Sequence, residues 1–234
     1  MSEVKIAPIP DLGQRTDEIT IYAGPCSVES AEQFDEVAEC IADLGLTWIR
    51  GGAFKPRTNP HSFQGLGEEA LKIMKSAGDR YNLKTLTEVM DSAHCQLVAD
   101  YVDGLQVGAR NFQNFSLLKK IGEVTADAHQ MVLYKRGFAG TIAEWLAATD
   151  YITDHGNTNV VLCERGIRTF ETATRFTLDI AAVPVIHKQS LYPVCIDVSH
   201  PAGQRDLVPS LAKAAIAAGA DSLMIEVHPN PPVA

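Results

Sequence analysis

Eight cationic side chains stand at or just after short apolar runs, although the chain as a whole is acidic. They are Arg50, Lys55, Arg57, Arg110, Lys135, Arg136, Arg165 and Arg168. Guanidinium groups bind phosphate or carboxylate through paired hydrogen bonds, and the lysine ammonium adds a point charge. Brought to one place, these cations repel one another unless an anionic ligand compensates them. The pattern therefore predicts substrates with several negative charges, phosphates first of all.

An alternative interpretation stays open for individual members of this cationic set. The ends of strands are exposed, and lysine and arginine are common there because they are well solvated. For Arg136 and Arg168 taken singly, solvation explains the residue as well as ligand binding does.

A second candidate site consists of Cys26, His200 and Glu226, which lie far apart in the sequence. Thiolate, imidazole and carboxylate together suit a borderline divalent transition metal such as Mn, Fe, Co or Zn. Spacing alone leaves a structural alternative open, because a single cysteine often packs as a small buried hydrophobe and a single histidine as a hydrogen-bonded polar residue. A metal site here depends on a fold that brings the three residues together.

Short β-branched runs alternate with longer amphipathic ones, some of which begin with a capping-box pair such as Thr141 and Glu144. The predicted strands are Ile19–Ala23, Thr47–Arg50, Lys84–Glu88, Gly104–Val107, Met131–Lys135, Asn159–Cys163, Val194–Val198 and Ser222–Val227. Eight apolar strands in strict alternation with helices predict an α/β fold, the (β/α)8 TIM barrel.

This barrel would position both candidate sites. In a closed (β/α)8 barrel the carboxyl ends of the strands build the active site, and the first and last strands adjoin. The cationic set follows several different predicted strands, so its members converge on one mouth. Cys26, His200 and Glu226 follow strands one, seven and eight, and they become neighbours there.

Composition and charge exclude several function classes. The chain has 234 residues, 46% hydrophobic and 21% charged, which excludes global disorder and suits a single barrel. A formal net charge of −9 argues against nucleic acid or an anionic membrane as the partner. Five cysteines without a C-x-x-C pair fit reduced thiols, and no signal peptide or membrane span is evident. We expect a soluble cytoplasmic protein in which residues 1–18 cover the bottom of the barrel and residues 19–234 form one catalytic domain.

Polar motifs follow each predicted strand and carry a family resemblance. They are GPCSVES, GAFKPRTNPHSFQG, TEVMD, QVGARNFQN, LYKRG, CERGIRTFET, DVSHPAGQR and IEVHPNP. Through these ordered motifs the chain resembles the short, single-barrel branch of the type I 3-deoxy-D-arabino-heptulosonate 7-phosphate (DAHP) synthases. The resemblance implies a metal-dependent transferase that condenses phosphoenolpyruvate with erythrose 4-phosphate and water, releasing phosphate, in the first step of the shikimate pathway. It also implies a homotetramer.

Site roles follow from the resemblance by motif match. The implied metal ligands are Cys26, His200 and Glu226. The implied phosphoenolpyruvate site contains Arg50, Arg110, Lys135 and Arg165. The implied erythrose 4-phosphate clamp is Lys55, Pro56, Arg57 and Thr58, with Arg57 and Thr58 on the phosphate.

Three residues have candidate catalytic roles. Lys55, between the two phosphate sites, is the candidate acid for the aldehyde oxygen. Glu88 is a candidate to orient or deprotonate the attacking water, with an ion pair to a nearby arginine as the alternative. Asp197, shortly before His200, is a candidate to position a metal-bound water or the sugar hydroxyls.

Three other functions stay open. The sister enzyme 3-deoxy-D-manno-octulosonate 8-phosphate synthase shares the barrel but typically shows K-A-N-R-S where this chain has Lys55-Pro56-Arg57-Thr58. A Schiff-base aldolase would use Lys135 as its nucleophile. A phosphometabolite-binding barrel without catalysis is the third alternative.

The end of the sequence carries an expectation of its own. A closed barrel ends with a helix after strand eight, yet the sequence stops at Ala234, soon after Glu226. The family pattern also continues with an aspartate that supplies a fourth metal ligand, whereas Asp221 precedes the last predicted strand. We therefore expect a chain truncated before its last helix and its fourth ligand.

Overall fold

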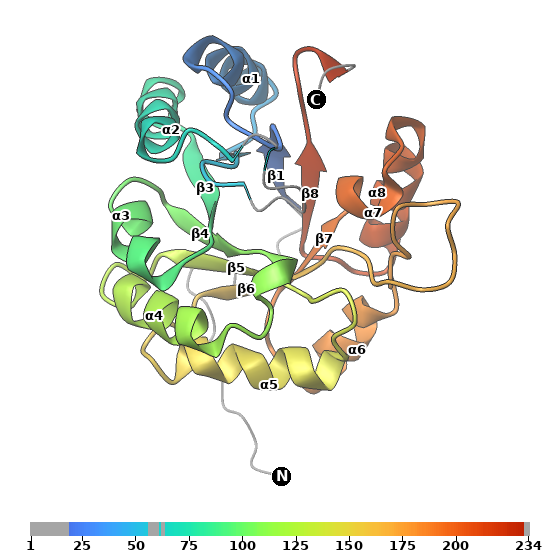
Figure 1. Cartoon of the computed structure of the whole chain (residues 1–234). Coiled ribbons are helices and arrows are strands. Elements are labelled where there is room, and N and C mark those ends of the chain that lie inside the picture. Colours follow the sequence, from blue (N-terminus) through green and yellow to red (C-terminus); the bar gives the residue numbers. More distant parts are fainter. Residues whose placement is uncertain (1–18, 56–60, 62–63, 232–234) are drawn as a thin grey trace.

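The computed structural model describes residues 19–55, 61 and 64–231. In this part of the chain, parallel strands close into a barrel in chain order, with helices around its outside (Figure 1). The strands are β1 (Thr20–Gly24), β2 (Trp48–Arg50), β3 (Lys84–Val89), β4 (Gly104–Val107), β5 (Met131–Lys135), β6 (Val160–Glu164), β7 (Val194–Asp197) and β8 (Ser222–Glu226). Each predicted strand end lies within one residue of the observed end. The predicted (β/α)8 TIM barrel is confirmed.

The connections between the strands differ in length. The helices are α1 (Ala31–Asp43), α2 (Glu68–Tyr81), α3 (Cys95–Ala99), α4 (Phe115–Thr125), α5 (Ile142–Thr153), α6 (Ala182–Gln189), α7 (Ser199–Ala202) and α8 (Val208–Ala217). Short 3-10 turns lie at Ser92–His94, Ala109–Asn111 and Arg205–Leu207. The predicted capping box begins α5, where Thr141 and Glu144 satisfy each other's backbone amides. The one-turn helix α7, between β7 and α8, carries His200.

Closure of the barrel depends on the pairing of its first and last strands. All five residues of β1 pair with β8, from Thr20 opposite Ser222 to Gly24 opposite Glu226. Inside the barrel, one buried apolar cluster fills the space below the carboxyl ends of the strands. It contains Tyr22, Leu86, Met131, Leu133, Val161, Cys163, Cys195 and Met224. A separate, larger cluster packs the outer faces of the strands against the helices.

Gly24 allows the loop after β1 to lie directly on β2. A Cβ atom at Gly24 would come 1.9 Å from the carbonyl oxygen of Arg50, and its φ of +148° disfavours other residues. The close approach lets Arg50 Nη1 donate a 2.7 Å hydrogen bond to the carbonyl oxygen of Pro25. A glycine therefore fixes the distance between Arg50 and the loop that carries Cys26.

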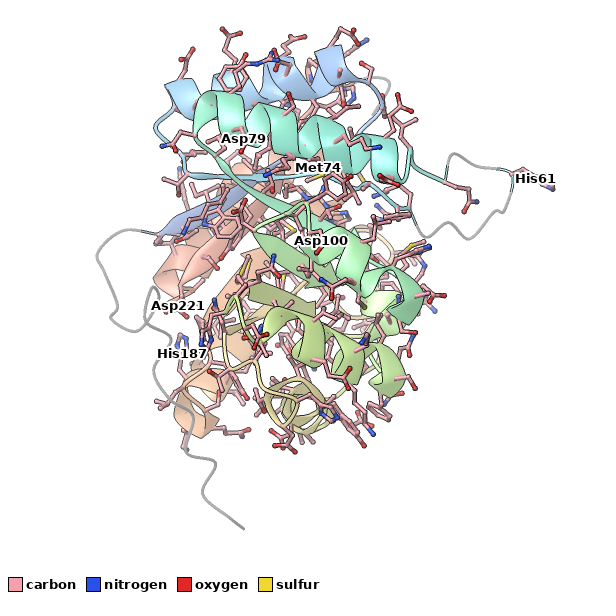
Figure 2. The ribbon with its side chains drawn as sticks, turned by 90° about the vertical axis from the view of Figure 1, so that its left-hand side faces the viewer. His61, Met74, Asp79, Asp100, His187 and Asp221 are labelled. Carbon is pink, nitrogen blue, oxygen red and sulfur yellow. The ribbon has the colours of Figure 1, made fainter. Side chains whose placement is uncertain are left out.

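The two ends of the barrel differ in what they carry (Figure 2). His187 and Asp221 lie at the amino-terminal end, where Asp221 Oδ2 is 2.8 Å from His187 Nε2 and accepts a 2.7 Å bond from the backbone of Val194. His61 lies at the opposite end, beyond β2. Asp221 is thus remote from the carboxyl ends of the strands, as the sequence predicts.

The predicted cover formed by residues 1–18 lies outside the described residues. Within those residues, no helix has the length and apolar character needed to cross a membrane.

Candidate active site

A cavity of about 330 Å³ lies at the carboxyl ends of the strands and collects most of the predicted site residues. Those that line it are Cys26, Arg50, Lys55, Glu88, Arg110, Lys135, Arg165, His200 and Glu226. Asp197 lies behind this wall and is fully buried. Pro56, Arg57 and Thr58 lie outside the described residues. The structure thus brings five of the eight predicted cations and the Cys-His-Glu set into one cavity.

Cys26, His200 and Glu226 form a cluster with the geometry of a metal site. One ligand atom from each residue lies within 4.8 Å of the others, and His200 Nε2 is 3.7 Å from Glu226 Oε2. The cluster is partly buried. A thiolate, an imidazole and a carboxylate at such separations fit a divalent transition metal and leave room for further ligands.

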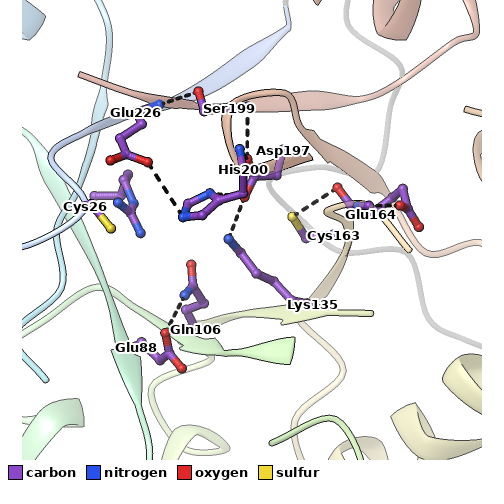
Figure 3. A network of polar contacts seen from close by, with 12 residues as sticks. Cys26, Glu88, Gln106, Lys135, Cys163, Glu164, Asp197, Ser199, His200 and Glu226 are labelled. Atoms are coloured by element: carbon purple, nitrogen blue, oxygen red, sulfur yellow. Dashed lines mark hydrogen bonds and ion pairs between the residues drawn. The ribbon is translucent and has the colours of Figure 1, made fainter. Parts of the chain in front are cut away.

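The orientation of His200 is fixed from behind by Asp197 (Figure 3). Asp197 Oδ2 is 2.7 Å from His200 Nδ1, and Asp197 Oδ1 accepts a 3.0 Å bond from the His200 backbone amide. With Nδ1 turned toward this carboxylate, the Nε2 side of the ring faces Glu226, the arrangement in which a carboxylate behind a histidine orients it toward a metal. Ser199 Oγ accepts a 2.9 Å bond from the backbone amide of Glu226 and so ties the ends of β7 and β8 together.

Asp197 is also the partner of Lys135. Lys135 Nζ donates a 2.7 Å hydrogen bond to Asp197 Oδ2, and both side chains are buried. Burial acts to raise the pKa of Asp197, but the charges and hydrogen bonds of His200 and Lys135 outweigh it and hold the pKa well below its ordinary value. The carboxylate therefore links the Cys26-His200-Glu226 cluster to the cationic wall.

Lys55 is in direct contact with Cys26. Its Nζ atom lies 3.0 Å from Cys26 Sγ and donates a 2.7 Å bond to the Cys26 carbonyl oxygen. Burial acts to raise the pKa of the Cys26 thiol, yet the hydrogen bond to His200 and the charges of Lys55 and Arg50 lower it to about 6. Burial also lowers the pKa of Lys55. The lowered pKa favours the thiolate of Cys26, the form that binds metals.

Glu88 presents a free carboxylate oxygen beside the cavity. Its Oε2 accepts a 3.2 Å bond from Gln106 Nε2, and its buried Oε1 has no hydrogen-bond partner within the described residues. A Cβ atom at Gly108 would come 2.0 Å from that Oε1, so the glycine makes room for it. The alternative prediction, an ion pair between Glu88 and an arginine, has no support in the described part of the chain.

Two arginines of the predicted phosphoenolpyruvate site also carry free donors. Arg50 Nε and Arg165 Nη1 are buried and have no partner in the chain that the structure describes. A buried donor without a partner is costly, and a bound anion would satisfy it. The cavity is therefore prepared for ligands with negative charge.

Arg136 is not part of this cavity, although the sequence placed it in the converging cationic set. Its Nη1 atom pairs with Glu164 Oε2 at 3.0 Å and Asp179 Oδ2 at 2.7 Å, and its Nε donates to the Gly140 carbonyl oxygen. The reason is strand alternation: Lys135 and Arg136 are consecutive, so their side chains point to opposite faces of the barrel wall. Arg168, the other ambiguous cation, lies outside the cavity lining as well.

Several cavity residues are missing from the sequence prediction. Ser27, Glu29, Gln106, Phe138, Arg175 and His228 line the cavity without having been singled out. Phe138 directly follows the LYKRG motif, so its position at a strand end could have been noticed. The position of Arg175 could not be predicted in the same way. Arg175 reaches the cavity only because the loop after β6 folds back on itself through the bridge between Ile167 and Thr177.

A larger cavity of about 650 Å³ opens on the outside of the barrel, between α2 and α3 and the start of β3. Figure 2 marks Asp79 and Asp100 from its lining. It receives no residue from a strand's carboxyl end, and Asp103 in its wall is bonded to Thr85. We regard it as a surface hollow between helices.

Comparison with known proteins places this architecture in context. The family model described as "DAHP synthetase I family" matches residues 12–234. A curated phospho-2-dehydro-3-deoxyheptonate aldolase from Thermotoga maritima is 52% identical over 212 residues, covering 91% of this chain and 62% of the relative. A 2-dehydro-3-deoxyphosphooctonate aldolase from Caulobacter vibrioides is 30% identical over 239 residues, covering 92% of this chain and 79% of the relative.

Solved structures agree with the sequence comparison. The crystal structure of the Thermotoga maritima phospho-2-dehydro-3-deoxyheptonate aldolase has a TM-score of 0.87 and 51% identity, covering 92% of this chain and 62% of that one. A truncated form of 3-deoxy-D-arabino-heptulosonate 7-phosphate synthase from the same organism has a TM-score of 0.83 and 48% identity, covering 92% and 77%. The chain thus spans about three fifths of the length of the first relative.

Proposed function

The chain belongs to the DAHP synthetase I family, and from this premise we propose that it condenses phosphoenolpyruvate with erythrose 4-phosphate and water to give DAHP and phosphate. The reaction would be the first step of the shikimate pathway. One observation carries the proposal: a single cavity holds both the Cys26-His200-Glu226 cluster and the cations Arg50, Lys55, Arg110, Lys135 and Arg165. A homotetramer is the assembly we propose with it.

The charge of the substrates matches that cavity. Phosphoenolpyruvate carries a phosphate and a carboxylate, and its sugar partner brings a second phosphate. Lys135 and Arg165, both buried at the cavity wall, would bind and orient the first substrate together with Arg50 and Arg110. The Arg50 Nε and Arg165 Nη1 donors, which have no partner within the described residues, would donate hydrogen bonds to that anion when it is bound. Orientation of two reactants in this way supplies much of the rate of a condensation.

The Cys26-His200-Glu226 cluster would hold a divalent transition metal, with Mn, Fe, Co and Zn as candidates. Such an ion, when bound, supplies Lewis-acid chemistry toward a carbonyl oxygen. The chain's own contribution is the preparation of the ligands. Asp197 keeps the Nε2 atom of His200 available, and Lys55 stabilises the Cys26 thiolate from 3.0 Å.

The carbon–carbon bond forms when C3 of phosphoenolpyruvate attacks the aldehyde carbon. Lys55 would protonate the developing alkoxide, because its buried ammonium has a lowered pKa and therefore gives up a proton more readily. Glu88 Oε1, which has no partner within the described residues, would orient or deprotonate the water that adds at C2. The resulting hemiketal phosphate loses inorganic phosphate through cleavage of its C–O bond.

A phosphate-release assay with both substrates tests the proposal. The chain is stripped with EDTA and assayed before and after addition of Mn, Fe, Co or Zn. We expect phosphate release that requires both substrates and is restored by metal. Phosphoenolpyruvate binding without turnover under every metal would contradict the catalytic function.

The same assay separates the other candidate functions. Arabinose 5-phosphate replaces erythrose 4-phosphate in a parallel reaction, because relatives with 30% identity are 2-dehydro-3-deoxyphosphooctonate aldolases. Faster turnover of the five-carbon sugar would assign the chain to that activity. Borohydride trapping of substrate on Lys135, with indifference to EDTA, would instead identify a Schiff-base aldolase.

A further inference from the structure

Arg175 lines the active-site cavity without a role in the proposed chemistry. It belongs to the loop between β6 and α6, which is held in place at several points. Ile167 and Thr177 exchange backbone hydrogen bonds of 2.8 and 3.0 Å, and the Phe176 amide donates to the Pro201 carbonyl oxygen at 3.0 Å. These contacts return the loop to α7, the helix that carries His200. Arg175 is therefore fixed at the cavity rim although it lies in a long connection.

Arg175 and the buried Arg165 both lie against a pair of stacked aromatic rings. Phe138 and Phe176 stack with centroids 5.1 Å apart and an interplanar angle of 12°. The Arg165 guanidinium carbon is 4.8 Å from the Phe138 centroid and 4.3 Å from that of Phe176. The Arg175 guanidinium carbon is 5.9 Å from the Phe176 centroid. Both guanidinium groups thus use the same ring as a platform.

The charges around this platform are not balanced within the described chain. Arg165 is 6% exposed, and its buried Nη1 has no hydrogen-bond partner. No carboxylate of the described residues forms an ion pair with Arg175. Burial lowers the pKa of Arg165, Asp197 acts against that shift, and the positive charge of Arg175 adds to it. Two neighbouring cations with a free buried donor require an anion.

We infer that Arg175 is a further phosphate-binding residue, which closes with Arg165 on the phosphate of phosphoenolpyruvate. The inference rests on the proposed function. Phosphoenolpyruvate is the source of that phosphate because Arg110, another residue of its implied site, contacts the same platform, with its guanidinium carbon 5.8 Å from the Phe138 centroid. The implied clamp for the sugar phosphate follows β2 instead. The loop after β6 therefore extends the phosphoenolpyruvate site beyond the strand ends.

Direct binding measurements test this role without depending on turnover. R175A is titrated calorimetrically with phosphoenolpyruvate, erythrose 4-phosphate and inorganic phosphate, at low and high salt. R205A serves as a charge-matched control, since Arg205 is exposed and outside the cavity. Loss of a charged hydrogen bond predicts about tenfold or more weaker phosphoenolpyruvate binding in R175A, and less than about twofold in R205A. Unchanged phosphoenolpyruvate binding by R175A would overturn the inference, as would an equal loss in R205A.

Additional variants and ligands separate the remaining explanations. R175K keeps the charge without the paired donors, so we expect an affinity between those of the wild type and R175A. F176W keeps a π face below both guanidinium groups and should bind like the wild type, whereas F176L should bind more weakly. A larger loss for erythrose 4-phosphate than for phosphoenolpyruvate would overturn the assignment to this substrate. A wild-type chain that binds phosphoenolpyruvate normally but gives no product refutes the proposed function alone and leaves this inference standing.

Discussion

Two buried ionic clusters meet at the end of β5, and they differ in what surrounds them. Lys135 pairs with Asp197, which also holds His200; we call these three residues the cavity cluster. Arg136, the next residue, pairs with Glu164 and Asp179, which we call the outer cluster. Both contain ion pairs of 2.7 Å, and Asp197 and Glu164 are both fully buried. Residue type and distance alone do not distinguish them.

The two clusters differ in how completely their charges are satisfied. In the outer cluster, Glu164 Oε1 accepts a 2.6 Å bond from the Gly166 amide while Oε2 pairs with Arg136, so both oxygens are used. Around the cavity cluster, Arg165 Nη1 and Glu88 Oε1 have no partners within the described residues. A closed set of charges holds loops together, whereas an open set is completed by ligands. Removing groups on the cavity side should therefore affect activity first, and removing groups from the outer cluster should affect stability first.

The largest effect should come from the Cys26-His200-Glu226 cluster, the candidate metal site, which shares His200 with the cavity cluster. We expect C26S to lose metal-dependent activity by about a thousandfold or more, which corresponds to roughly 4 kcal/mol, because a hydroxyl is a poor substitute for a thiolate on a transition metal. Metal content by mass spectrometry and phosphate release measure the two losses together. C40S is the matched control, since Cys40 is exposed on α1. Full activity in C26S would show that Cys26 is structural.

The second effect concerns the outer cluster. R136A leaves Glu164 and Asp179 without their cation, and loss of one partner of a buried pair costs about 3–5 kcal/mol. Denaturant unfolding should show this loss, while kcat/KM per folded molecule stays within about threefold of the wild type. The double variant R136M/E164L, which removes both charges of the most deeply buried pair and leaves only the more exposed Asp179, should recover much of the stability. A large fall in kcat/KM without a fall in stability would show that Arg136 acts in the active-site cavity rather than in the outer cluster.

The sequence predicts the architecture because the strands of a parallel barrel are nearly uniform apolar runs. It also predicts the meeting of Cys26, His200 and Glu226, since closure of β1 onto β8 follows from the fold alone. The position of Asp197 behind His200 could not be predicted, because it depends on the conformation of the turn between β7 and α7. Alternation of side chains along a strand predicts that Lys135 and Arg136 face opposite sides of the barrel wall. The sequence prediction grouped them in one cavity because the two cations are adjacent in the motif LYKRG.

The loop after β6 marks the limit of prediction from sequence. Arg165 follows its strand directly, so its position depends on the barrel. Arg175 depends on the bridge between Ile167 and Thr177 and on stacking between Phe138 and Phe176, which join different loops. Such contacts have no periodic signature, because irregular connections are shaped by tertiary packing. The expected clamp residues Arg57 and Thr58 remain predictions.

The third prediction compares Glu164 and Arg165, two consecutive residues at the end of β6. Glu164 belongs to the outer cluster, and Arg165 faces the cavity. We expect R165A to raise the KM for phosphoenolpyruvate by roughly 10- to 150-fold, because it loses charged hydrogen bonds worth about 1.5–3 kcal/mol. The KM for erythrose 4-phosphate should change much less. Steady-state kinetics with each substrate varied in turn measure this difference, and near-normal kinetics would remove Arg165 from the site.

The smallest effect is a pH dependence of stability carried by Glu164. Burial raises the pKa of Glu164 above its ordinary value of 4.5, although Arg136 and the Gly166 amide act against the shift. A carboxyl group with a raised pKa in the folded state contributes stability that is fully present below its unfolded pKa and is lost as pH rises through the folded pKa. The stability advantage of the wild type over E164Q should therefore be larger at about pH 5 than at about pH 8.

Denaturant unfolding of both proteins at several pH values measures this difference. E164Q should be less stable throughout, because an amide accepts hydrogen bonds through its single oxygen, whereas Glu164 accepts through both of its oxygens. E144Q is a suitable control for the pH series, since Glu144 is an exposed helix-capping residue and its pKa is lowered by the backbone and side-chain hydrogen bonds of Thr141. Its contribution has the opposite sign: it is present above the unfolded pKa and is lost as pH falls. If the advantage over E164Q instead grew as pH rose, Arg136 and the Gly166 amide would stabilise the Glu164 carboxylate by more than burial destabilises it, and the pKa of Glu164 would be lowered rather than raised.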